Sequence, residues 1–558
     1  MRSTGRTTRV GVASICLALL AAACGSSSDN KSAGGQTGGG QTGGGAKQGG
    51  VFRLGIVEPT AIDPYNSQES EGTNVNKAIF EGLVSLDNAT AELKPGVAQT
   101  WSRDDACNVW TFKLVPNTQF SNGETVTAQS FIDGMTRAAL QKAASDTAQF
   151  MSDIQGFDAI HGTTSAPGTA TTLSGLSAPD PNTLQVKLSA PNCDFDKKTL
   201  QPVFSPVPKT AGAAEPHSAY AEMPIGNGPF KMKEPWQHDK SITLVRNDTY
   251  HGTKAGLDEV DFSILPSQNA LDLEYKNFQA GQADFARIPP ELQPQAKAQF
   301  EPQGQFIKKE VYGINYLLVS TFNAPLNNAD SRKAISYAID RDSIISGVFK
   351  GFQTKATSII PPQFKDYYQA GVCTACTFDV AKAKDFAAKG GLKPGTHVSL
   401  LFNTGGGHEA WTQAIKQQLE QNLGLVVDYN GIPFKELLVK EAANDSAGLY
   451  RAAWSADYPS VDDFLRPLLS KTSFPPGDNR GRYSNDAFET LINKGLAAKD
   501  QAEKVKNYKD AEKLAIDTDM GLIPLWYRTQ YRVVNTSKFS GIDLDFFENP
   551  TLATIRLK

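Results

Sequence analysis

The sequence predicts an α/β protein, because segments with strand-like and helix-like patterns are mixed along the chain. Three segments alternate apolar and polar side chains, as half-buried strands do, and these are residues 109–114, 183–188 and 260–264. Residues 334–339 and 505–515 instead place apolar side chains three and four positions apart, as on one face of a helix. Asp330 and Ser331 precede the first of these segments and are expected to cap it. Such mixing favours an α/β fold.

The N-terminus has the pattern of an export signal. Three arginines precede an apolar run over residues 10–20, which is too short to span a bilayer, so we expect residues 1–23 to be a signal peptide. Small residues then lead directly to Cys24, an arrangement similar to the lipidation motif of bacterial lipoproteins. We therefore expect Cys24 to carry a lipid anchor. Ordinary signal-peptide cleavage, with Cys24 incidental, is the alternative.

Residues 24–50 predict a flexible tether, since they include repeated Gly-Gly-Gln-Thr units with no apolar face to pack. The remaining chain, with 40% apolar and 20% charged residues overall, predicts a globular body with room for two or three domains. The formal charge of the whole chain is −4, and loss of the three leader arginines makes it −7. An acidic body argues against nucleic acid as a partner.

Four cysteines remain once the leader is removed and Cys24 is lipidated. An even number in an exported protein predicts disulfides, although four cysteines allow three pairings. Cys373 and Cys376 are close enough in sequence to pair within a turn, which leaves Cys107 to pair with Cys193. A zinc or redox role for the Cys373–Cys376 segment is the weaker alternative, because no second such motif or nearby histidine accompanies it.

Recognisable catalytic motifs are missing from the sequence. The six histidines form no His-x-x-x-His pair, and no Gly-x-Ser-x-Gly elbow occurs. A strand, a glycine-rich loop over residues 403–407 and an amphipathic helix are expected between His397 and Asn422, but the loop lacks the Lys-Ser/Thr of a phosphate-binding loop. We therefore expect a binding protein without enzymatic activity, cofactor or metal.

A series of fragments in unbroken order carries a family resemblance. They include LGIVEPTAIDPYNS, IFEGLVSLD, LKPGVAQTW, WTFKLVPNTQFSNGETVTAQSF, PIGNGPFKM, SRKAISYAIDRDSI, WSADYPSVDDFL and IPLWY. From about Val51 to the C-terminus the chain resembles the extracellular solute-binding proteins of family 5, which include the oligopeptide-, dipeptide- and nickel-binding receptors of ABC importers.

The resemblance implies a two-lobed, periplasmic-binding-protein-like clamp of type II, cluster C, with an extra third domain. Lobe I would comprise residues 51–80, 209–311 and 528–558, the extra domain residues 81–208, and lobe II residues 312–527. Strands that cross near Val311 and Tyr527 would act as the hinge. The protein would be a monomer, held by its lipid at the extracellular face of the bacterial membrane, where it would serve an ABC permease and ATPase complex.

The resemblance also implies a peptide site. Asp457 matches the family aspartate that pairs with the peptide's α-ammonium, and Arg451 and His408 match residues that meet the carboxylate of shorter and longer peptides. The alternatives are that Asp457 caps a turn, that Arg451 forms a surface salt bridge, and that His408 is simply exposed.

Further contributions to the site are expected from aromatic and loop residues. Trp454 and Tyr458 flank the aspartate and would shield it from water, with core packing as the alternative. Ser70 lies in a loop whose family counterpart pairs with the peptide backbone. Asp133 and the Ser460-Val461 pair depart from the family pattern and leave the pocket shape open, so a nickel chelate, haem, an opine or an oligosaccharide is the alternative ligand.

Overall fold

The computed structural model describes residues 48–558 apart from 68, 89, 163–165, 444–447 and 476. The expected signal peptide, Cys24 and nearly all of the expected tether therefore lie outside the described residues. Within the described part, the helices are too short or too polar to cross a membrane.

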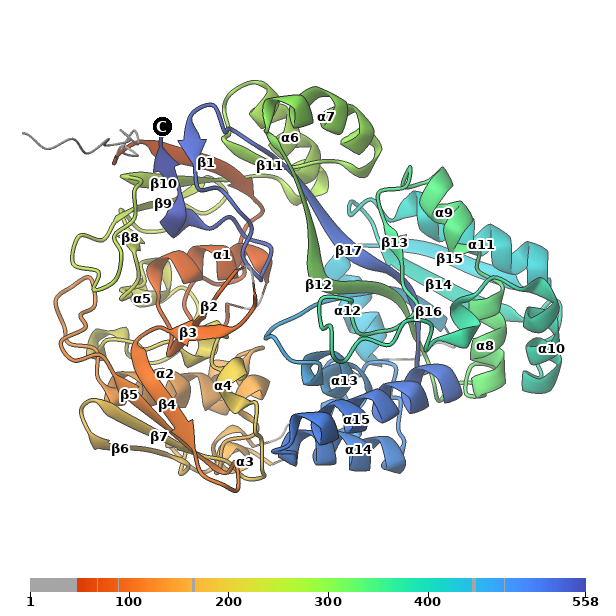
Figure 1. The fold of residues 1–558 in the computed structure, drawn as a ribbon, viewed down its shortest axis with the longest axis horizontal. Helices are drawn as coiled ribbons and strands as arrows, with labels where there is room; N and C mark the ends of the chain where they lie inside the picture. The colour runs from red at the N-terminus through yellow and green to blue at the C-terminus, as the bar shows by residue number, and fades with distance from the viewer. Residues whose placement is uncertain (1–47, 68, 89, 163–165, 444–447, 476) are drawn as a thin grey trace, which may run out of the picture. The chain divides into compact units, whose positions relative to one another are not determined.

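A large mixed sheet runs through the body (Figure 1). The order of its strands is β15 (Val426–Ile432), β14 (His397–Asn403), β16 (Gly448–Ser455), β12 (Phe306–Val319), β17 (Leu522–Val534), β11 (Phe285–Arg287), β1 (Val51–Ile56), β10 (Glu259–Ile264), β9 (Ser241–Arg246) and β8 (Phe230–Met232), with β13 (Thr354–Lys355) beside β17. Segments far apart in the sequence are neighbours in this sheet. The parallel pairs β14–β15, β14–β16 and β1–β10 give it the α/β character that the sequence predicts.

The long strands β12 and β17 connect the two ends of this sheet (Figure 1). They pair antiparallel from Phe306 with Val533, but the register shifts between Glu310 and Ile314. Such an irregularity bends a strand and weakens the ladder locally. It falls at the position expected for a hinge, and motion about it stays a prediction.

A second, antiparallel sheet comprises β4 (Ala98–Arg103), β5 (Val109–Leu114), β7 (Thr183–Lys187) and β6 (Leu176–Asp180), in that spatial order. Two short pairs are β2 (Val84–Leu86) with β3 (Leu93–Pro95), and β18 (Phe539–Ser540) with β19 (Arg556–Leu557). The three segments with alternating patterns are confirmed as β5, β7 and β10, because each presents an apolar face to a buried core.

Helices cover the sheets and fill the connections. Their bounds are α1 (Ser70–Ile79), α2 (Ala128–Ala139), α3 (Phe157–His161), α4 (Phe195–Lys198), α5 (Ala219–Glu222), α6 (Ala270–Gln279), α7 (Gln293–Phe300), α8 (Ala329–Tyr337), α9 (Arg341–Gly347), α10 (Val380–Gly390), α11 (Glu409–Leu423), α12 (Phe434–Ala443), α13 (Asp462–Leu469), α14 (Asp486–Ala497) and α15 (Gln501–Glu512). The expected cap of α8 at Asp330-Ser331 is wrong. Asn328 caps this helix, since its side-chain oxygen accepts the Asp330 N–H at 2.8 Å, which leaves Asp330 in the first turn.

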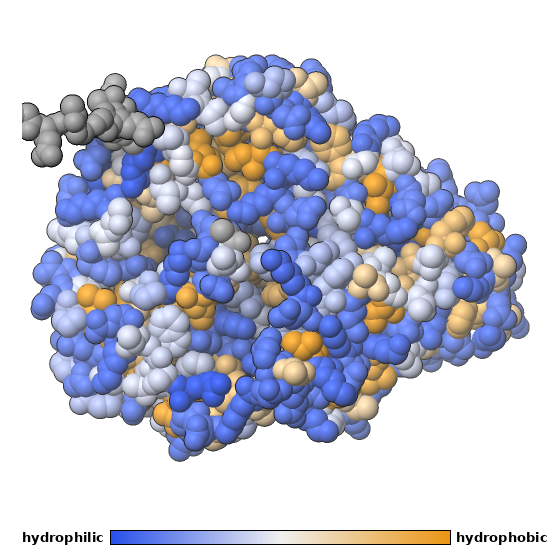
Figure 2. Space-filling view, in the orientation of Figure 1, coloured by the Kyte–Doolittle hydropathy of each residue, from blue (hydrophilic) through white to orange (hydrophobic). Residues whose placement is uncertain are grey.

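The buried apolar residues form separate clusters along the chain. One cluster gathers residues between 314 and 527, a second gathers residues mainly between 65 and 204, and two others combine residues of 52–80 and 207–300 with residues after 530. The face drawn in Figure 2 is mostly hydrophilic, with hydrophobic residues in small scattered patches. The body thus contains several separate apolar cores.

Both expected disulfides are present. Cys107 pairs with Cys193, with Cα atoms 5.0 Å apart, and Cys373 pairs with Cys376, with Cα atoms 5.4 Å apart. All four cysteines are buried. The first disulfide links segments 86 residues apart beside the second sheet, whereas the second closes a single turn.

Candidate ligand site

Strand β16 carries much of the candidate site. It lies between β14 and β12, with Arg451 opposite Leu317 and Trp454 opposite Ile314. The strand ends at Ser455, and the chain turns at Asp457. Strand β14 pairs with β16 only over Gly448–Tyr450, whereas β12 pairs with it over Leu449–Ser455, so the backbone at Arg451 is held by β12.

The Asp457 carboxylate has no partner among the described residues. Its backbone is fixed on both sides, because its N–H donates to the Asp463 carboxylate at 2.6 Å and its carbonyl accepts from the Gln201 amide. In contrast, the carboxylate accepts no hydrogen bond and forms no ion pair with the residues that the structure describes, so the turn-capping alternative has no support. Burial, followed by the nearby charge of Asp478, raises the pKa of Asp457 from 3.8 to about 8.

Arg451 is a desolvated cation without a partner in the described part of the chain. Its Nε atom is buried without a hydrogen bond, and no carboxylate lies within ion-pair distance. Burial, reinforced by the positive charge of Arg528, lowers the pKa of Arg451 from 12.5 to about 10. An anion bound here would accept a hydrogen bond from Nε and would offset the cost of burying the positive charge. This is the chemistry expected of a carboxylate-binding residue.

His408 lies just before α11 and close to Arg451. Its Nδ1 atom accepts the Trp411 indole N–H at 3.2 Å. Burial, together with the charges of Arg451 and Arg528, lowers the pKa of His408 to about 2, so the ring is neutral at physiological pH. The structure therefore brings His408 and Arg451 together in one cationic region, whereas the acidic group beside Asp457 consists of Asp463 and Asp478.

A bridge of paired charges leads from one region to the other. Arg480 contacts Asp478 at 3.2 Å and Glu441 at 2.9 Å, and the charge of Glu441 in turn acts on Arg451. Asp478 and Glu441, which Arg480 joins, thus act by their charges on Asp457 and on Arg451 respectively.

The two aromatic residues differ in their surroundings. Trp454 is half-buried and packs against the cluster of residues 314–527. Tyr458 is 2% exposed, belongs to the cluster of residues 65–204, and donates its hydroxyl to Asp462 at 3.0 Å. The core-packing alternative therefore describes Tyr458 better than a role as a shield.

Ser70 begins α1 and lines a hollow of about 190 Å³. Arg528, Gln530 and Glu548 line the same hollow, and Glu548 accepts from Arg528 and from Ser455 of β16, each at 2.9 Å. Sequence reasoning missed Arg528, Glu548 and Asp478. A signal existed for Arg528 alone, since it follows the IPLWY fragment directly in β17 after Tyr527.

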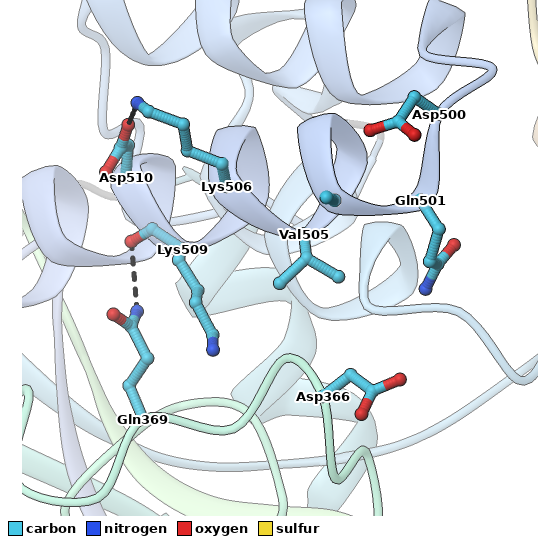
Figure 3. Close-up of a pocket in the computed structure, with 9 residues that line it drawn as sticks. Asp366, Gln369, Asp500, Gln501, Val505, Lys506, Lys509 and Asp510 are labelled. Atoms are coloured by element: carbon cyan, nitrogen blue, oxygen red, sulfur yellow. Dashed lines mark hydrogen bonds and ion pairs between the residues drawn. The ribbon is translucent and has the colours of Figure 1, made fainter.

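A larger hollow of about 820 Å³ lies beside α15 (Figure 3). Two of its charged side chains pair with each other, since Lys506 binds Asp510 at 2.6 Å, and the Gln369 amide donates to the Lys509 carbonyl at 3.0 Å. In Figure 3 the remaining polar groups, such as Asp366 and Asp500, lie apart and do not converge on one point. This hollow lacks the unpaired, desolvated charges that distinguish the region of Asp457 and Arg451.

Solved structures identify the class of fold. A periplasmic oligopeptide-binding protein of Borrelia burgdorferi superimposes with a TM-score of 0.78 at 22% identity, covering 91% of this chain and 100% of that chain. Haemophilus influenzae OppA in complex with RPPGFSPFR superimposes with a TM-score of 0.76 at 22% identity, covering 92% and 99%. The protein thus has the two-lobed fold of periplasmic binding proteins, which confirms the expected fold class.

Sequence comparison then gives the family. The model of the bacterial extracellular solute-binding proteins, family 5 Middle, matches residues 92–475, and the chain belongs to this family. The oligopeptide-binding protein OppA of Bacillus subtilis is 28% identical over 483 residues, covering 85% of this chain and 86% of its own length. The family and these relatives are binding proteins, and they do not favour the alternative ligands.

Proposed function

We propose that this protein is the receptor of an ABC-type importer and that it captures oligopeptides for a membrane permease and ATPase complex. The family supports the receptor role, and relatives named as oligopeptide-binding proteins support the ligand class. One observation carries the proposal: a desolvated acid, Asp457, and a desolvated cation, Arg451, both lack an ion-pair partner among the described residues. A peptide in solution carries an ammonium and a carboxylate, the two groups that would neutralise them.

Each end of the peptide is assigned to one group of residues. The α-ammonium pairs with Asp457, and the carboxylate of a short peptide pairs with Arg451, with the neutral His408 beside it. Arg451 and Ser455 are separated by about 13 Å along β16, the length of about four residues of an extended peptide. The protein thereby recognises the ends of the peptide and tolerates varied side chains between them.

The lobes proposed for this function are residues 51–80, 209–311 and 528–558 for lobe I, and residues 312–527 for lobe II, with residues 81–208 as the extra domain. The separate apolar clusters support this division. Closure would bend β12 and β17 at the irregular register near Glu310. A monomer anchored through Cys24 to the extracellular face of the membrane would stay close to its permease.

Calorimetry on the purified protein tests the ligand assignment. A tripeptide such as Ala-Ala-Ala should bind, and its N-acetylated form should bind at least thirtyfold more weakly, because acetylation removes the cation that Asp457 requires. C-terminal amidation provides the matched test of Arg451. Equal binding of the free and acetylated peptides would contradict the ammonium assignment.

A further inference from the structure

A cluster of histidines and glutamates lies on the surface, outside the candidate ligand site. His217 Nδ1 lies 2.9 Å from one oxygen of Glu222, and His238 Nε2 lies 2.7 Å from the other. The second nitrogen of His238, Nδ1, lies 2.6 Å from Glu58. The ligand atoms that His217, Glu222 and His238 offer all lie within 4.8 Å of one another.

The hydrogen-bond arrangement of His238 requires a cation. A neutral imidazole donates one hydrogen bond only, so it can satisfy Glu58 or Glu222 but not both. The other nitrogen would then direct its lone pair at a carboxylate oxygen, which is repulsive. A second proton or a metal ion removes this conflict.

We propose that His217, His238 and Glu222 form a binding site for a divalent transition-metal ion of the zinc class. Two imidazole nitrogens and one carboxylate oxygen are a donor set that Zn²⁺ prefers, with water in the remaining position. Glu58 accepts the Nδ1–H of His238 and so fixes the tautomer that leaves Nε2 free for the metal, as a supporting carboxylate does at many zinc sites.

The geometry needs little adjustment to admit the ion. Ligand atoms about 2.0–2.1 Å from a tetrahedral zinc ion are about 3.3 Å from one another. The contacts of 2.9 Å and 2.7 Å to Glu222 would therefore open by about half an ångström, and the widest separation, up to 4.8 Å, would close to about the same value. Rotation of the exposed His217 side chain and of the Glu222 carboxylate allows both changes. The His238 ring is already held by Trp236, whose ring centre lies 4.3 Å away.

The site joins three separate segments of the fold. Glu58 follows β1, Glu222 ends α5, and His238 lies between β8 and β9. A search for adjacent histidines in the sequence misses this arrangement, since its members extend from residue 58 to residue 238. The bound ion would connect the segment around α5 with the β8–β9 connection, and Glu58 would link His238 to the end of β1.

Equilibrium dialysis of the untagged full-length protein against Zn²⁺ tests this proposal. After removal of metal with a chelator, the wild type should bind one equivalent that is lost in each of the variants His217→Gln and His238→Gln, or bound at least tenfold more weakly. His217→Gln is the safer variant, because the side chain is 78% exposed and its loss leaves the core intact. Thermal unfolding should show a Zn²⁺-dependent rise in midpoint for the wild type and for neither of these two variants.

His397→Gln is the matched control. His397 is also an exposed histidine beside one carboxylate, with Nδ1 3.1 Å from Asp428, but it lacks a second imidazole. Its replacement should leave Zn²⁺ binding unchanged, and none of the three variants should alter the affinity for a tripeptide. Absence of Zn²⁺ binding by the wild type, or equal binding by the wild type and both cluster variants, would overturn the proposal.

Discussion

Two regions of this protein bury ionisable side chains, and the pKa of an aspartate is lowered in one region and raised in the other. The first is the buried ion cluster, which consists of Asp153, Lys198, Asp462 and Arg466. The second is the candidate ligand site, which consists of Asp457, Arg451 and His408. Both contain carboxylates and cations, but the chain pairs the charges in the first region and leaves them unpaired in the second.

In the ion cluster every charge has a partner. Arg466 contacts Asp153 at 2.9 Å and Asp462 at 2.8 Å, and Lys198 contacts Asp153 at 2.8 Å. Burial alone would raise the pKa of Asp153, but Arg466 and Lys198 outweigh it and hold that pKa well below its usual value. The cluster joins α13 to the segment between β5 and β6 and to α4.

At the candidate ligand site, no nearby cation offsets the effect of burial on the pKa of Asp457. The pKa of Asp457 rises to about 8, a shift opposite in sign to that of Asp153. Both residues are aspartates with a large desolvation cost, so the difference lies in the presence of a cationic neighbour. We infer that burial within the chain's own network serves stability, whereas burial without a partner prepares a group for a ligand that supplies the missing charge.

Replacing Arg466 by leucine should have the largest effect. This change leaves Asp153 and Asp462 buried without their shared cation, so the free energy of unfolding should fall by about 3–5 kcal/mol. Urea titration followed by circular dichroism measures it. Lys506→Met, which removes an exposed pair with Asp510, is the control and should cost less than about 1 kcal/mol. Equal losses in both variants would show that the cluster has no special role in stability.

Replacing Asp457 by asparagine should weaken peptide binding without lowering the stability of the unliganded protein. Affinity for a tripeptide should fall at least thirtyfold, about 2 kcal/mol, because the ammonium loses its anion. The unliganded variant should be more stable than the wild type. Folding raises the pKa of Asp457 from 3.8 to about 8, so this residue's favourable contribution exists at acidic pH and is lost as the pH rises through that range.

The stability difference between the Asp457→Asn variant and the wild type should therefore increase from about pH 5 to about pH 8. Urea titrations at several pH values measure this difference. A variant that is destabilised at every pH would indicate that the Asp457 side chain stabilises the fold, and would contradict its role as an unpaired group that binds the ligand.

Much of the fold followed from local patterns. Alternating side chains identified β5, β7 and β10, and the spacing of residues 505–515 identified α15 with the turn of helix that follows it. The cap of α8 was misplaced because Asn, Asp and Ser are all good caps and three of them occur at residues 328–331. Which strands become neighbours in the large sheet depends on contacts between distant segments, and periodicity does not encode these.

The site was less predictable from sequence than the fold. Asp457 could be named because it lies within the fragment WSADYPSVDDFL, and Arg451 and His408 because they match family positions three residues before Trp454 and just after the glycine-rich loop. Asp478 could not, because its influence on Asp457 arises only when the segment after α13 approaches β16. Arg528 follows a recognisable fragment, but its influence on His408 depends on where β17 lies. Tyr458 is adjacent to Asp457 in the sequence, which suggests that its ring shields the aspartate from water. In the structure the ring packs in the cluster of residues 65–204.

Peptide binding should release a proton below pH 8. Free Asp457 is largely protonated near pH 6.5, whereas the bound pair contains a carboxylate and an ammonium, so about one proton should leave for each tripeptide bound. Affinity should accordingly rise by up to tenfold per pH unit between about pH 6 and pH 7.5. Calorimetry in two buffers of different ionisation enthalpy measures the release, which should disappear in the Asp457→Asn variant. Binding without proton exchange would contradict the raised pKa.

Replacing His408 by glutamine should have the smallest effect, although His408 lies beside the cationic group. Burial and the charges of Arg451 and Arg528 lower the pKa of His408 to about 2, so the ring is neutral and glutamine replaces one uncharged polar group by another. Affinity for a tripeptide should change by less than about fivefold, since a neutral hydrogen bond contributes about 1 kcal/mol or less.

Arg451→Gln is the matched comparison for His408, because it removes a charge from the same region and should weaken binding at least tenfold. Calorimetry of both variants from about pH 5 to pH 8 should also show that His408→Gln keeps the pH profile of the wild type. If His408→Gln were as damaging as Arg451→Gln, the ring would have to be charged when peptide binds. The carboxylate of the peptide would then bind two cations, Arg451 and protonated His408, rather than Arg451 alone.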